Sequence, residues 1–557
     1  MRLTGAVLLF SVPISSFFAL EARQPVRARK AMVAAQEPLA TDAGVAVLKA
    51  GGNAVDAAVA VGFALAVTHP TAGNLGGGGF LLARMAGGRT AFFDFRERAP
   101  QAATRNMYLD AAGNLTRDSV AGWRAAGVPG TVRGLEQAHR KLGTRPWASL
   151  VAPAAGLAAQ GFPLSYSSAR SLRAAKLLAE FAESRRIFQN GGKFYEPGDR
   201  LVQPELARTL ERIARQGSRD FYEGETAARL AAEMKAHGGL ITLEDLKDYA
   251  VVERKVLEGQ YRGYRILTAP PPSSGGVGLL QMMGVLEKSE YEKHGAGSAA
   301  AIHFVAETMR RYYADRAEFL ADPDFAPVPV AGLLAPPYLD KLRASIDPHR
   351  ASSSDTLGHG DPAAGESDET THFSIVDEAG NAVAMTYTIN GSYGCGVTVP
   401  GLGFLLNNEM DDFSAKPGTP NMFGLVQGEA NAIQPRKRPL SSMTPTIVLR
   451  DGKLYLVVGA PGGSRIITGV LQVILNILDF GMNPQEAIDW PRFHHQWKPD
   501  RLSLERGFSP DTVALLKARG HQVDSVSSVA VVEAIRLAGG WLEGASDGRG
   551  NGKAAGY

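Results

Sequence analysis

Hydrophobic residues recur with helical spacing near the start of the chain. In LATDAGVAVLKAGGNAVDAAVAVGFALAV, apolar positions repeat every three to four residues on both sides of Gly51-Gly52. Paired glycines commonly end a helix, and an asparagine such as Asn53 commonly caps the next one. We therefore predict two helices within 39–70. The stretch 56–70 is Ala-rich and apolar but short for a bilayer span, which indicates a buried core helix.

The middle of the chain, about 130–345, is also predicted to be helical. It is rich in Ala, Leu, Glu and Arg, with helical periodicity at 152–161 and 301–322. The stretch TAPPPSSGGVG, 268–278, is predicted to be a loop from its proline, serine and glycine content. A second polar stretch, 351–369, is rich in Ser, Asp, Gly and Ala. We expect it to be mobile and solvated.

Three pairs of apolar runs predict β-hairpins. NLGGGGFLLARMAGGRTAFFDF is split by Gly87-Gly88, THFSIVDEAGNAVAMTYTI turns at EAGN, and TPTIVLRDGKLYLVVGAPGGS turns at Asp451-Gly452. The last hairpin runs into an apolar helix that starts at Ser464. Strands stacked against apolar helices predict an α/β protein with a layered sandwich architecture.

Length and charge narrow the class of protein. The chain has 557 residues, which is long enough for a large multilayer domain or several domains. Its 59 basic and 56 acidic residues give a net charge of +3, which offers no reason to expect a nucleic-acid partner.

The first 24 residues differ from the rest. Arg2 precedes the apolar run LTGAVLLFSVPISSFFAL, a pattern typical of a secretory signal peptide. Pro13 and several serines interrupt the run, so a permanent membrane anchor is the less favoured alternative. We expect an exported protein, periplasmic or secreted.

The single cysteine, Cys395, rules out a disulfide within the chain and a thiolate zinc cluster. Its position between two glycines indicates a small buried residue in a tight turn rather than a catalytic thiol. His494 and His495 are adjacent, and neighbouring strand residues point to opposite faces. We therefore interpret this pair as structural and not as a metal site.

The polar stretch 351–369 ends abruptly at Thr370, directly before a predicted core strand. A threonine hydroxyl is a weak nucleophile unless a base lies beside it. Cleavage between Glu369 and Thr370 would expose an α-amine with a pKa of about 7.7–8, which suits a general base near neutral pH. The plainer interpretation of a Thr-Thr pair at a strand start is ordinary β-branched strand sequence.

Seven motifs in a fixed order favour the first interpretation. They are NLGGGGF, DFRERAP, TTHFSIVDEAGNAVAMTYTIN, LLNNEMDDFSAKPG, KRPLSSMTPTIV, GAPGGSRIIT and PRFHHQW. Together they resemble the gamma-glutamyltransferases (gamma-glutamyltranspeptidases), a family of N-terminal nucleophile hydrolases. The resemblance extends from MVAAQEPLATDAG at residue 32 to the C-terminal residues.

The resemblance implies a four-layer αββα sandwich that cuts itself into two subunits. The large subunit would be residues 25–369 and the small subunit residues 370–557, held together as a heterodimer. The activity implied is transfer of the γ-glutamyl group of glutathione and related compounds to water or to amino acid and peptide acceptors. No metal or organic cofactor is implied.

The resemblance also assigns the catalytic groups. Thr370 would attack the γ-amide, and Thr388 would help to hold it. The backbone amides of Gly462 and Gly463, between a strand and a helix start, would hold the developing oxyanion. The structural alternative for this PGGS sequence is a plain tight turn.

Six further residues are implied to bind the donor. Its α-carboxylate requires a cation and hydroxyls, and its α-ammonium requires acids and an amide. The carboxylate side is assigned to Arg96, Ser441 and Ser442, and the ammonium side to Asn390, Glu409 and Asp412. Taken alone, Arg96 could instead form a surface ion pair with Glu97 or Asp94, and the two acids could lie in a solvated turn. NLGGGGF lacks the Gly-Lys-Ser/Thr of a P-loop, so we expect it to permit close backbone packing near the pocket.

Three positions depart from the family pattern. Phe423, in the lid-like segment SAKPGTPNMFGLVQG, stands where bacterial relatives commonly carry Tyr, so a hydroxyl that could latch the lid is lost. Glu409 stands where some bacterial members have Gln, and Cys395 where Ser or Thr is more usual.

Two other functions are alternatives to the transferase. A related acylase on the same scaffold, acting on glutaryl-type β-lactam side chains, would not need the ammonium-binding acids. An uncut, inactive scaffold that binds γ-glutamyl ligands would not need Thr370 or the paired glycines. The sequence retains all of these groups, which disfavours both alternatives.

Overall fold

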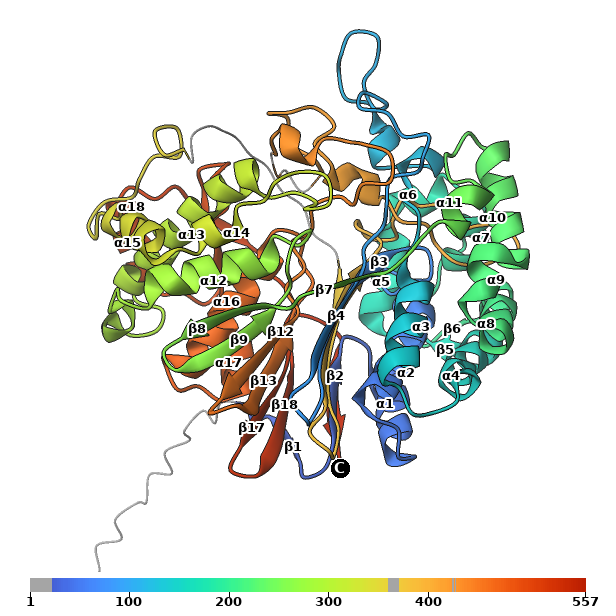
Figure 1. Cartoon of the computed structure of the whole chain (residues 1–557), viewed down its shortest axis with the longest axis horizontal. Coiled ribbons are helices and arrows are strands. Elements are labelled where there is room, and N and C mark those ends of the chain that lie inside the picture. Colours follow the sequence, from blue (N-terminus) through green and yellow to red (C-terminus); the bar gives the residue numbers. More distant parts are fainter. Residues whose placement is uncertain (1–22, 359–369, 423–424, 426) are drawn as a thin grey trace, which may run out of the picture.

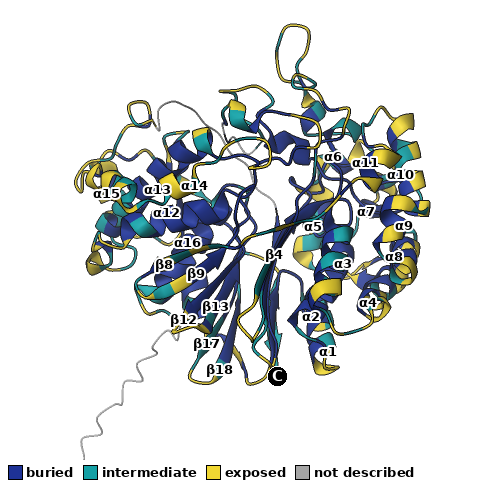
Figure 2. Ribbon diagram, viewed as in Figure 1, coloured by how far each residue is buried: buried dark blue, intermediate teal, exposed yellow. Residues whose placement is uncertain are grey.

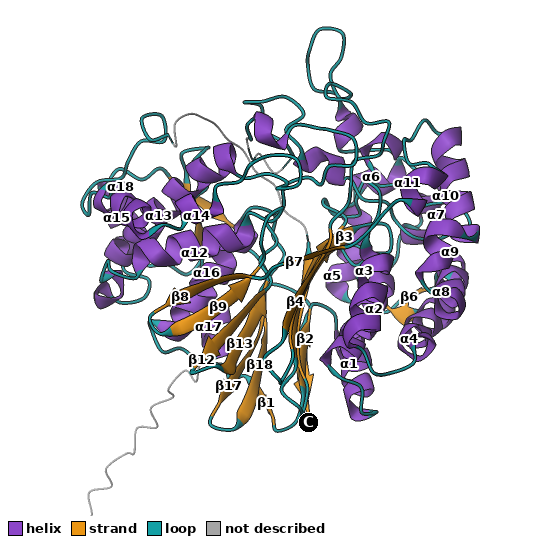
Figure 3. Ribbon diagram, viewed as in Figure 1, coloured by secondary structure: helices purple, strands orange, loops and turns teal. Residues whose placement is uncertain are grey.

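The computed structural model describes residues 23–358, 370–422, 425 and 427–557. Among these residues, two seven-stranded sheets lie face to face at the centre of the molecule, and helices cover the outer face of each (Figures 1 and 3). This arrangement is the four-layer αββα sandwich expected from the sequence.

The first sheet has strands from both ends of the chain, and all its neighbouring strands are antiparallel. Its order is β1 (Val26–Ala28), β18 (Trp541–Ser546), β17 (Glu533–Ala538), β13 (Lys453–Gly459), β12 (Thr446–Arg450), β9 (Tyr264–Thr268) and β8 (Leu257–Tyr261).

The second sheet is also antiparallel and places the strand after Thr370 near its middle. Its order is β19 (Lys553–Gly556), β2 (Met32–Ala35), β10 (Thr371–Val376), β11 (Ala382–Thr388), β3 (Gly78–Arg84), β4 (Thr90–Phe95) and β7 (Val252–Arg254). The other strands of the described residues form two small sheets. One consists of β14 (Phe493–His494), β15 (Leu502–Glu505) and β16 (Val523–Val526). In the other, β5 (Phe162–Pro163) pairs with β6 (Arg200–Leu201).

The central strands are buried on both faces, which explains their continuous hydrophobic runs (Figure 2). Side chains of a strand alternate between faces. In β3, Leu81 packs into the core beneath the helices of the second sheet, whereas Phe80 and Leu82 belong to the core shared with the first sheet.

Two groups of helices form the outer layers (Figure 1). The group beside the second sheet comprises α1 (Pro38–Lys49), α2 (Ala54–Thr68), α3 (Thr131–Leu142), α4 (Trp147–Gln160), α5 (Tyr166–Ala174), α6 (Lys176–Ala179), α7 (Ala182–Phe188), α8 (Pro204–Gln216), α9 (Ser218–Glu223), α10 (Glu225–Ala236) and α11 (Leu243–Lys247). The group beside the first sheet comprises α12 (Gly275–Leu286), α13 (Ala299–Phe319), α14 (Val330–Leu333), α15 (Pro336–Ala344), α16 (Arg465–Leu478), α17 (Pro484–Asp489) and α18 (Pro510–Ala518).

The predicted pair of N-terminal helices and the three predicted hairpins are confirmed. Asn53 caps α2 through hydrogen bonds from the backbone amides of Val55 and Asp56, and every residue of α2 is buried. No helix within the described residues is long and apolar enough to cross a membrane.

Three predictions about elements need correction. The middle of the chain is mainly helical, but it also contains the strands β5, β6, β7, β8 and β9, which the helical interpretation missed. The predicted loop 268–278 ends early, because α12 begins at Gly275. Its glycines are packing positions rather than helix breakers: a Cβ on Gly276 would lie 2.0 Å from the carbonyl oxygen of Ala269.

The third correction concerns 351–369. Its first part is not solvated throughout, since Ser354 is buried and hydrogen-bonded on several sides. Residues 359–369 lie outside the described residues, as does the predicted signal segment apart from Arg23 and Gln24.

Candidate active site

One cavity brings together nine of the ten site residues predicted from the sequence. Its lining includes Arg96, Thr370, Thr388, Asn390, Glu409, Asp412, Ser441, Ser442 and Gly463. The tenth, Gly462, is the neighbour of Gly463 in the chain. Thr388 is the last residue of β11, and the others lie in segments outside the strands of both sheets, so the fold rather than sequence proximity assembles the site.

Thr370 lies at the start of a central strand and is 5% exposed. Strand β10 begins at the next residue and pairs with β11, with Thr371 opposite Tyr387. Extending that register by one residue places Thr370 opposite Thr388. The hydroxyl of Thr388 accepts a hydrogen bond of 2.8 Å from the backbone amide of Asn390, which adopts a left-handed conformation with φ 72°.

The glycine-rich motif NLGGGGF packs against this strand pair. A Cβ on Gly77 would lie 2.0 Å from the carbonyl oxygen of Thr388, and one on Gly79 would lie 2.4 Å from that of Thr386. The expected close backbone packing near the pocket is therefore confirmed.

The Gly462–Gly463 turn connects β13 to α16. Both residues have positive φ, 134° and 51°, which glycine adopts readily. A side chain at Gly462 would also place its Cβ 2.9 Å from the Cα of Ala530. Ser464 follows the turn and donates a hydrogen bond of 2.7 Å from its hydroxyl to Oε1 of Gln496, in the PRFHHQW motif.

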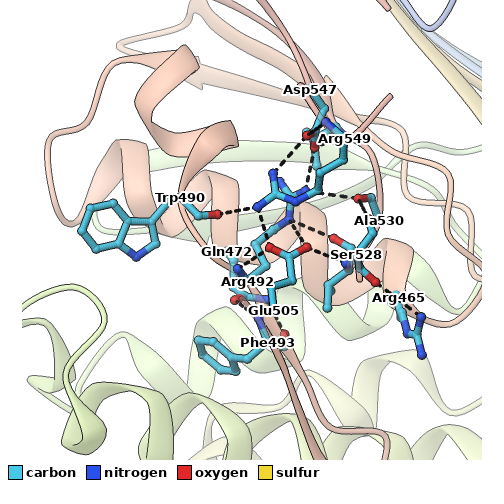
Figure 4. Close-up of polar contacts among 12 residues, drawn as sticks. Arg465, Gln472, Trp490, Arg492, Phe493, Glu505, Ser528, Ala530, Asp547 and Arg549 are labelled. Atoms are coloured by element: carbon cyan, nitrogen blue, oxygen red, sulfur yellow. Dashed lines mark hydrogen bonds and ion pairs between the residues drawn. The ribbon is translucent and has the colours of Figure 1, made fainter. Parts of the chain in front are cut away.

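A buried ion network supports the segment behind this turn (Figure 4). Arg492 is fully buried and donates hydrogen bonds to the carbonyl oxygens of Val529 and Ala530 at 2.8 and 3.1 Å. Its guanidinium also pairs with Asp547 at 2.6 Å. The backbone amide of Val529 donates to Glu505. The network fixes the chain that contacts Gly462.

The charged groups of the pocket are buried and in direct contact. Arg96 is 1% exposed and forms ion pairs with Glu409 and Asp412. Burial would lower the pKa of Arg96, but the two acids raise it above its usual value. The alternatives of a surface ion pair and a solvated acidic turn are therefore wrong. The two sides of the predicted donor pocket instead meet in one charge cluster.

Glu97 is a further buried acid in this cluster that the sequence interpretation did not assign. Its carboxylate lies 3.7 Å from the guanidinium of Arg96, and burial, partly offset by Arg96, raises its pKa to about 7. It also interacts with Glu409, whose pKa is raised by burial. Among the described residues, neither oxygen of Glu97 has a hydrogen-bond donor facing it.

The hydroxyl side of the pocket also contains a cation that the sequence interpretation missed. Arg316, on α13, is 1% exposed and donates to the hydroxyl of Ser442 at 3.3 Å and to that of Ser274 at 2.9 Å. Ser441 is held through its backbone, with its amide donating to the carbonyl oxygen of Pro272 at 2.8 Å. Arg316 lies on the buried face of a long helix, where motif comparison offered no signal.

The segment after the acidic motif is anchored beside the pocket. Asp411 accepts hydrogen bonds of 2.7 Å from the backbone amide of Met422 and from the hydroxyl of Ser119. Burial raises the pKa of Asp411 to about 6. Phe423, on which the lid prediction rests, lies outside the described residues.

The remaining candidates have structural positions. Cys395 is fully buried, as predicted, and burial raises the pKa of its thiol to about 12. His494 bonds to Thr468, whereas His495 bonds to Asp500 and accepts from the backbone amide of Trp497. The described residues contain no cluster of three or more His, Cys, Asp or Glu side chains arranged for a metal ion.

Comparison with known proteins agrees with this architecture. Residues 40–557 match the model of the family described as Gamma-glutamyltranspeptidase. The Escherichia coli K12 protein named glutathione hydrolase proenzyme is 50% identical, over 96% of this chain and 93% of its own. A crystal structure of cephalosporin acylase from Bacillus halodurans superposes with a TM-score of 0.87, at 28% identity and 99% coverage of both chains. The crystal structure of Helicobacter pylori gamma-glutamyltranspeptidase is 44% identical, with a TM-score of 0.57 over 58% of this chain and 93% of that one.

The chain belongs to the gamma-glutamyltranspeptidase family, as its seven ordered motifs predicted. It is an enzyme of the gamma-glutamyltransferase and glutathione hydrolase class. The expected fold of an N-terminal nucleophile hydrolase is likewise confirmed.

Proposed function

We propose that the chain is a precursor that cleaves itself between Glu369 and Thr370. The mature enzyme then transfers the γ-glutamyl group of glutathione or a related compound to water or to an amine. One observation carries the proposal: Thr370, at the start of a central strand, shares a cavity with a buried arginine–carboxylate cluster and Gly463.

The charge cluster suits recognition of an amino acid head group. The α-carboxylate of the donor would pair with Arg96 and the hydroxyls of Ser441 and Ser442. Its α-ammonium would replace the guanidinium as the cation next to Glu409 and Asp412, with Asn390 as a further partner. The exchange keeps a cation beside Glu409 and Asp412, and buried carboxylates left without one are costly.

Catalysis would proceed through an ester. The α-amine of Thr370 accepts the proton of its own hydroxyl, whose oxygen attacks the γ-carbonyl carbon. The oxyanion of the tetrahedral intermediate is held by the backbone amides of Gly462 and Gly463. The C–N bond then breaks, and the departing amine takes the proton. A water molecule or an acceptor amine then attacks the carbonyl carbon of the γ-glutamyl-threonine ester and gives a proton to the α-amine. The ester C–O bond breaks, and the α-amine passes the proton to the hydroxyl oxygen of Thr370.

The buried acids favour a transferase over an acylase for glutaryl side chains. A glutaryl group lacks the ammonium, so Glu409 and Asp412 would lose their cation when Arg96 turns to the carboxylate. We predict that a γ-glutamyl anilide is turned over with a kcat/KM about a hundredfold or more above that of the glutaryl anilide of the same amine. Equal values would favour the acylase.

Two further proposals concern the ends of the precursor. We propose that residues 1–24 are a secretory signal, so the enzyme is exported to the periplasm or secreted. We also propose that residues 25–369 and 370–557 remain together as the large and small subunits. Both follow from the sequence patterns, and mass spectrometry of the protein recovered from its native host would test both boundaries.

A denaturing gel with N-terminal sequencing tests the proposal most directly. Wild-type protein should show two fragments, the smaller starting at Thr370, and Thr370→Ala should remain one uncut chain. Thr370→Ser is the matched control, because it keeps a hydroxyl next to the scissile bond and should still cleave. A small fragment that begins at any other residue contradicts the assignment.

A further inference from the structure

The polar segment 345–357, here called the strap, lies against one face of α13. His303 contacts the carbonyl oxygen of Asp347 at 2.8 Å, and Glu307 accepts from the backbone amide of Ser352 at 3.3 Å. One turn further, Arg311 donates to the carbonyl oxygen of Ser345 at 2.6 Å. Residues at such spacing share one face of a helix, so α13 presents a polar row to the strap.

The other side of the strap is held by residues that follow Thr370 in the chain. The indole Nε1 of Trp497 donates to the carbonyl oxygens of Ser354 and Leu357 at 3.1 and 2.6 Å. Asp500 accepts from the backbone amide of Ser354 at 2.7 Å. The amide of Ala351 donates to the carbonyl oxygen of Arg519 at 2.8 Å. The strap therefore bridges the two proposed subunits.

Charge and backbone conformation show that this contact is strongly constrained. Arg310 is 1% exposed and pairs with Glu307, with Asp500 and with the hydroxyl of Ser354. Burial alone would raise the pKa of Glu307, but Arg310 and Arg311 lower it to about 2. Trp497 is held at φ 70°, a conformation that a bulky residue keeps only when its surroundings enforce it.

We propose that the strap is a positioning element for self-cleavage, with Trp497 and Asp500 as its positioning residues. The inference rests on the proposed cleavage between Glu369 and Thr370. Only twelve residues, 358–369, separate the strap from Thr370. Fixing Leu357 sets the point from which this link must reach the site of cleavage. Trp497, the last residue of the PRFHHQW motif, thereby has a role in self-cleavage.

Chain entropy gives the expected size of the effect. Releasing 351–357 would lengthen the link from twelve to nineteen residues. The probability of bringing two chain ends together falls with about the 3/2 power of the link length, so cleavage should slow by about twofold from this source alone. Any loss of orientation at the scissile bond adds to that factor. Once the bond is cut, the link no longer constrains Thr370, so turnover should be unaffected.

The test compares cleavage with turnover in the full chain. The double variant Trp497→Phe, Asp500→Asn removes the indole donor and the charged acceptor while keeping their shapes. Precursor conversion is followed by denaturing gel from the time of synthesis, and kcat and KM for a γ-glutamyl anilide are measured per cleaved site. We expect conversion at least twofold slower, with kcat and KM unchanged. Trp147→Phe is the matched control. It removes an indole hydrogen bond of the same kind, to the carbonyl oxygen of Ile213, but in the helix group beside the second sheet, whereas the strap lies on α13 beside the first.

Each outcome bears on the proposal. Conversion at the wild-type rate would overturn it, and so would a matching fall in kcat, since that indicates a general structural role. If the double variant does not accumulate, Ser354→Ala removes only the hydroxyl that Arg310 contacts. It should slow conversion in the same direction, and a wild-type rate for it would likewise overturn the proposal. If wild-type protein does not cleave at Thr370, the proposed function fails instead.

Discussion

At the scale of single residues, the candidate site concentrates charge where burial makes charge costly. Arg96, Glu97 and Glu409 are each at most 1% exposed, and Asp412 is 9% exposed. Three ionised carboxylates around one guanidinium would leave an excess of negative charge. Burial raises the pKa values of these acids, which favours their protonated forms and reduces that excess. Such a cluster is poorly suited to stabilising the fold and well suited to binding a cation.

The role of Arg96 can be separated from its charge. Arg96→Lys keeps a cation beside Glu409 and Asp412 but loses the planar fork that binds a carboxylate through two hydrogen bonds. We expect KM for a γ-glutamyl donor to rise by about ten- to a hundredfold, with cleavage of the precursor intact. Arg96→Ala should raise KM further, but it also leaves the buried acids without a cation. Unchanged KM in the lysine variant, measured with a γ-glutamyl anilide, would remove Arg96 from the carboxylate site.

The raised pKa of Glu97 predicts a pH dependence of donor binding. Below a pKa of about 7 this carboxyl group holds a proton, and above it the group is ionised. The donor ammonium favours ionised carboxylates, so binding releases a proton and should strengthen as pH rises from 6 to 8. Titration calorimetry of L-glutamate in two buffers with different ionisation enthalpies measures that release. Glu97→Gln should abolish it, and an equal release in the variant would place the proton elsewhere.

Sequence reasoning found most of the site at this scale. Nine of the predicted residues lie around one cavity. They could be predicted because the order of the motifs carries family information that single residues lack. Sequence reasoning could not predict the contact of Arg96 with Glu409 and Asp412. These acids lie 313 and 316 residues after Arg96 in the chain, so the contact depends on how distant loops fold together. Arg316 was missed for a related reason, since a buried arginine on α13 looks like any charged residue of a helix.

At the scale of elements, predictions failed where tertiary packing overrode local composition. Gly275, Gly276 and Gly278 suggested a loop, but they allow α12 to pack closely against its neighbours. The polar start of 351–369 suggested solvated chain, but Trp497 and Asp500 satisfy its backbone groups. Long apolar runs such as those of α2, β10 and β11 were predicted correctly because burial and periodicity agree there.

The lid segment yields a prediction at this scale. Asp411 holds the middle of the segment through the backbone amide of Met422, and Phe423 follows without a hydroxyl to donate. A lid closed by apolar contact alone should open more readily and admit water to the ester. We expect Phe423→Tyr to shift product partitioning toward transfer when glycylglycine is the acceptor. Phe404→Tyr, at a buried aromatic position outside the cavity lining, is a control for the added hydroxyl. Partitioning that is unchanged, or shifted toward hydrolysis, would show that this hydroxyl does not hold the lid.

At the scale of the whole molecule, the two proposed subunits are interleaved. In the second sheet, β2 of the large subunit lies between β19 and β10 of the small subunit, and β11 then pairs with β3 of the large subunit. The first sheet mixes them as well, with β1 on β18 and β9 on β12. Both central cores therefore contain residues from each subunit.

This interleaving predicts that cleavage does not create separable parts. Pulling the subunits apart would break backbone ladders in both sheets and expose both cores, which amounts to unfolding. The cleaved enzyme should therefore elute as one species at high dilution and in high salt, because the interface does not depend on exposed ion pairs. Its two subunits should also lose structure in a single denaturant transition, followed by fluorescence and circular dichroism. The uncut Thr370→Ala chain is the matched control, and its transition should have nearly the same denaturant dependence, since m follows the surface exposed on unfolding. Elution of separate folded subunits, or a first transition that releases one subunit intact, would contradict the interleaved arrangement.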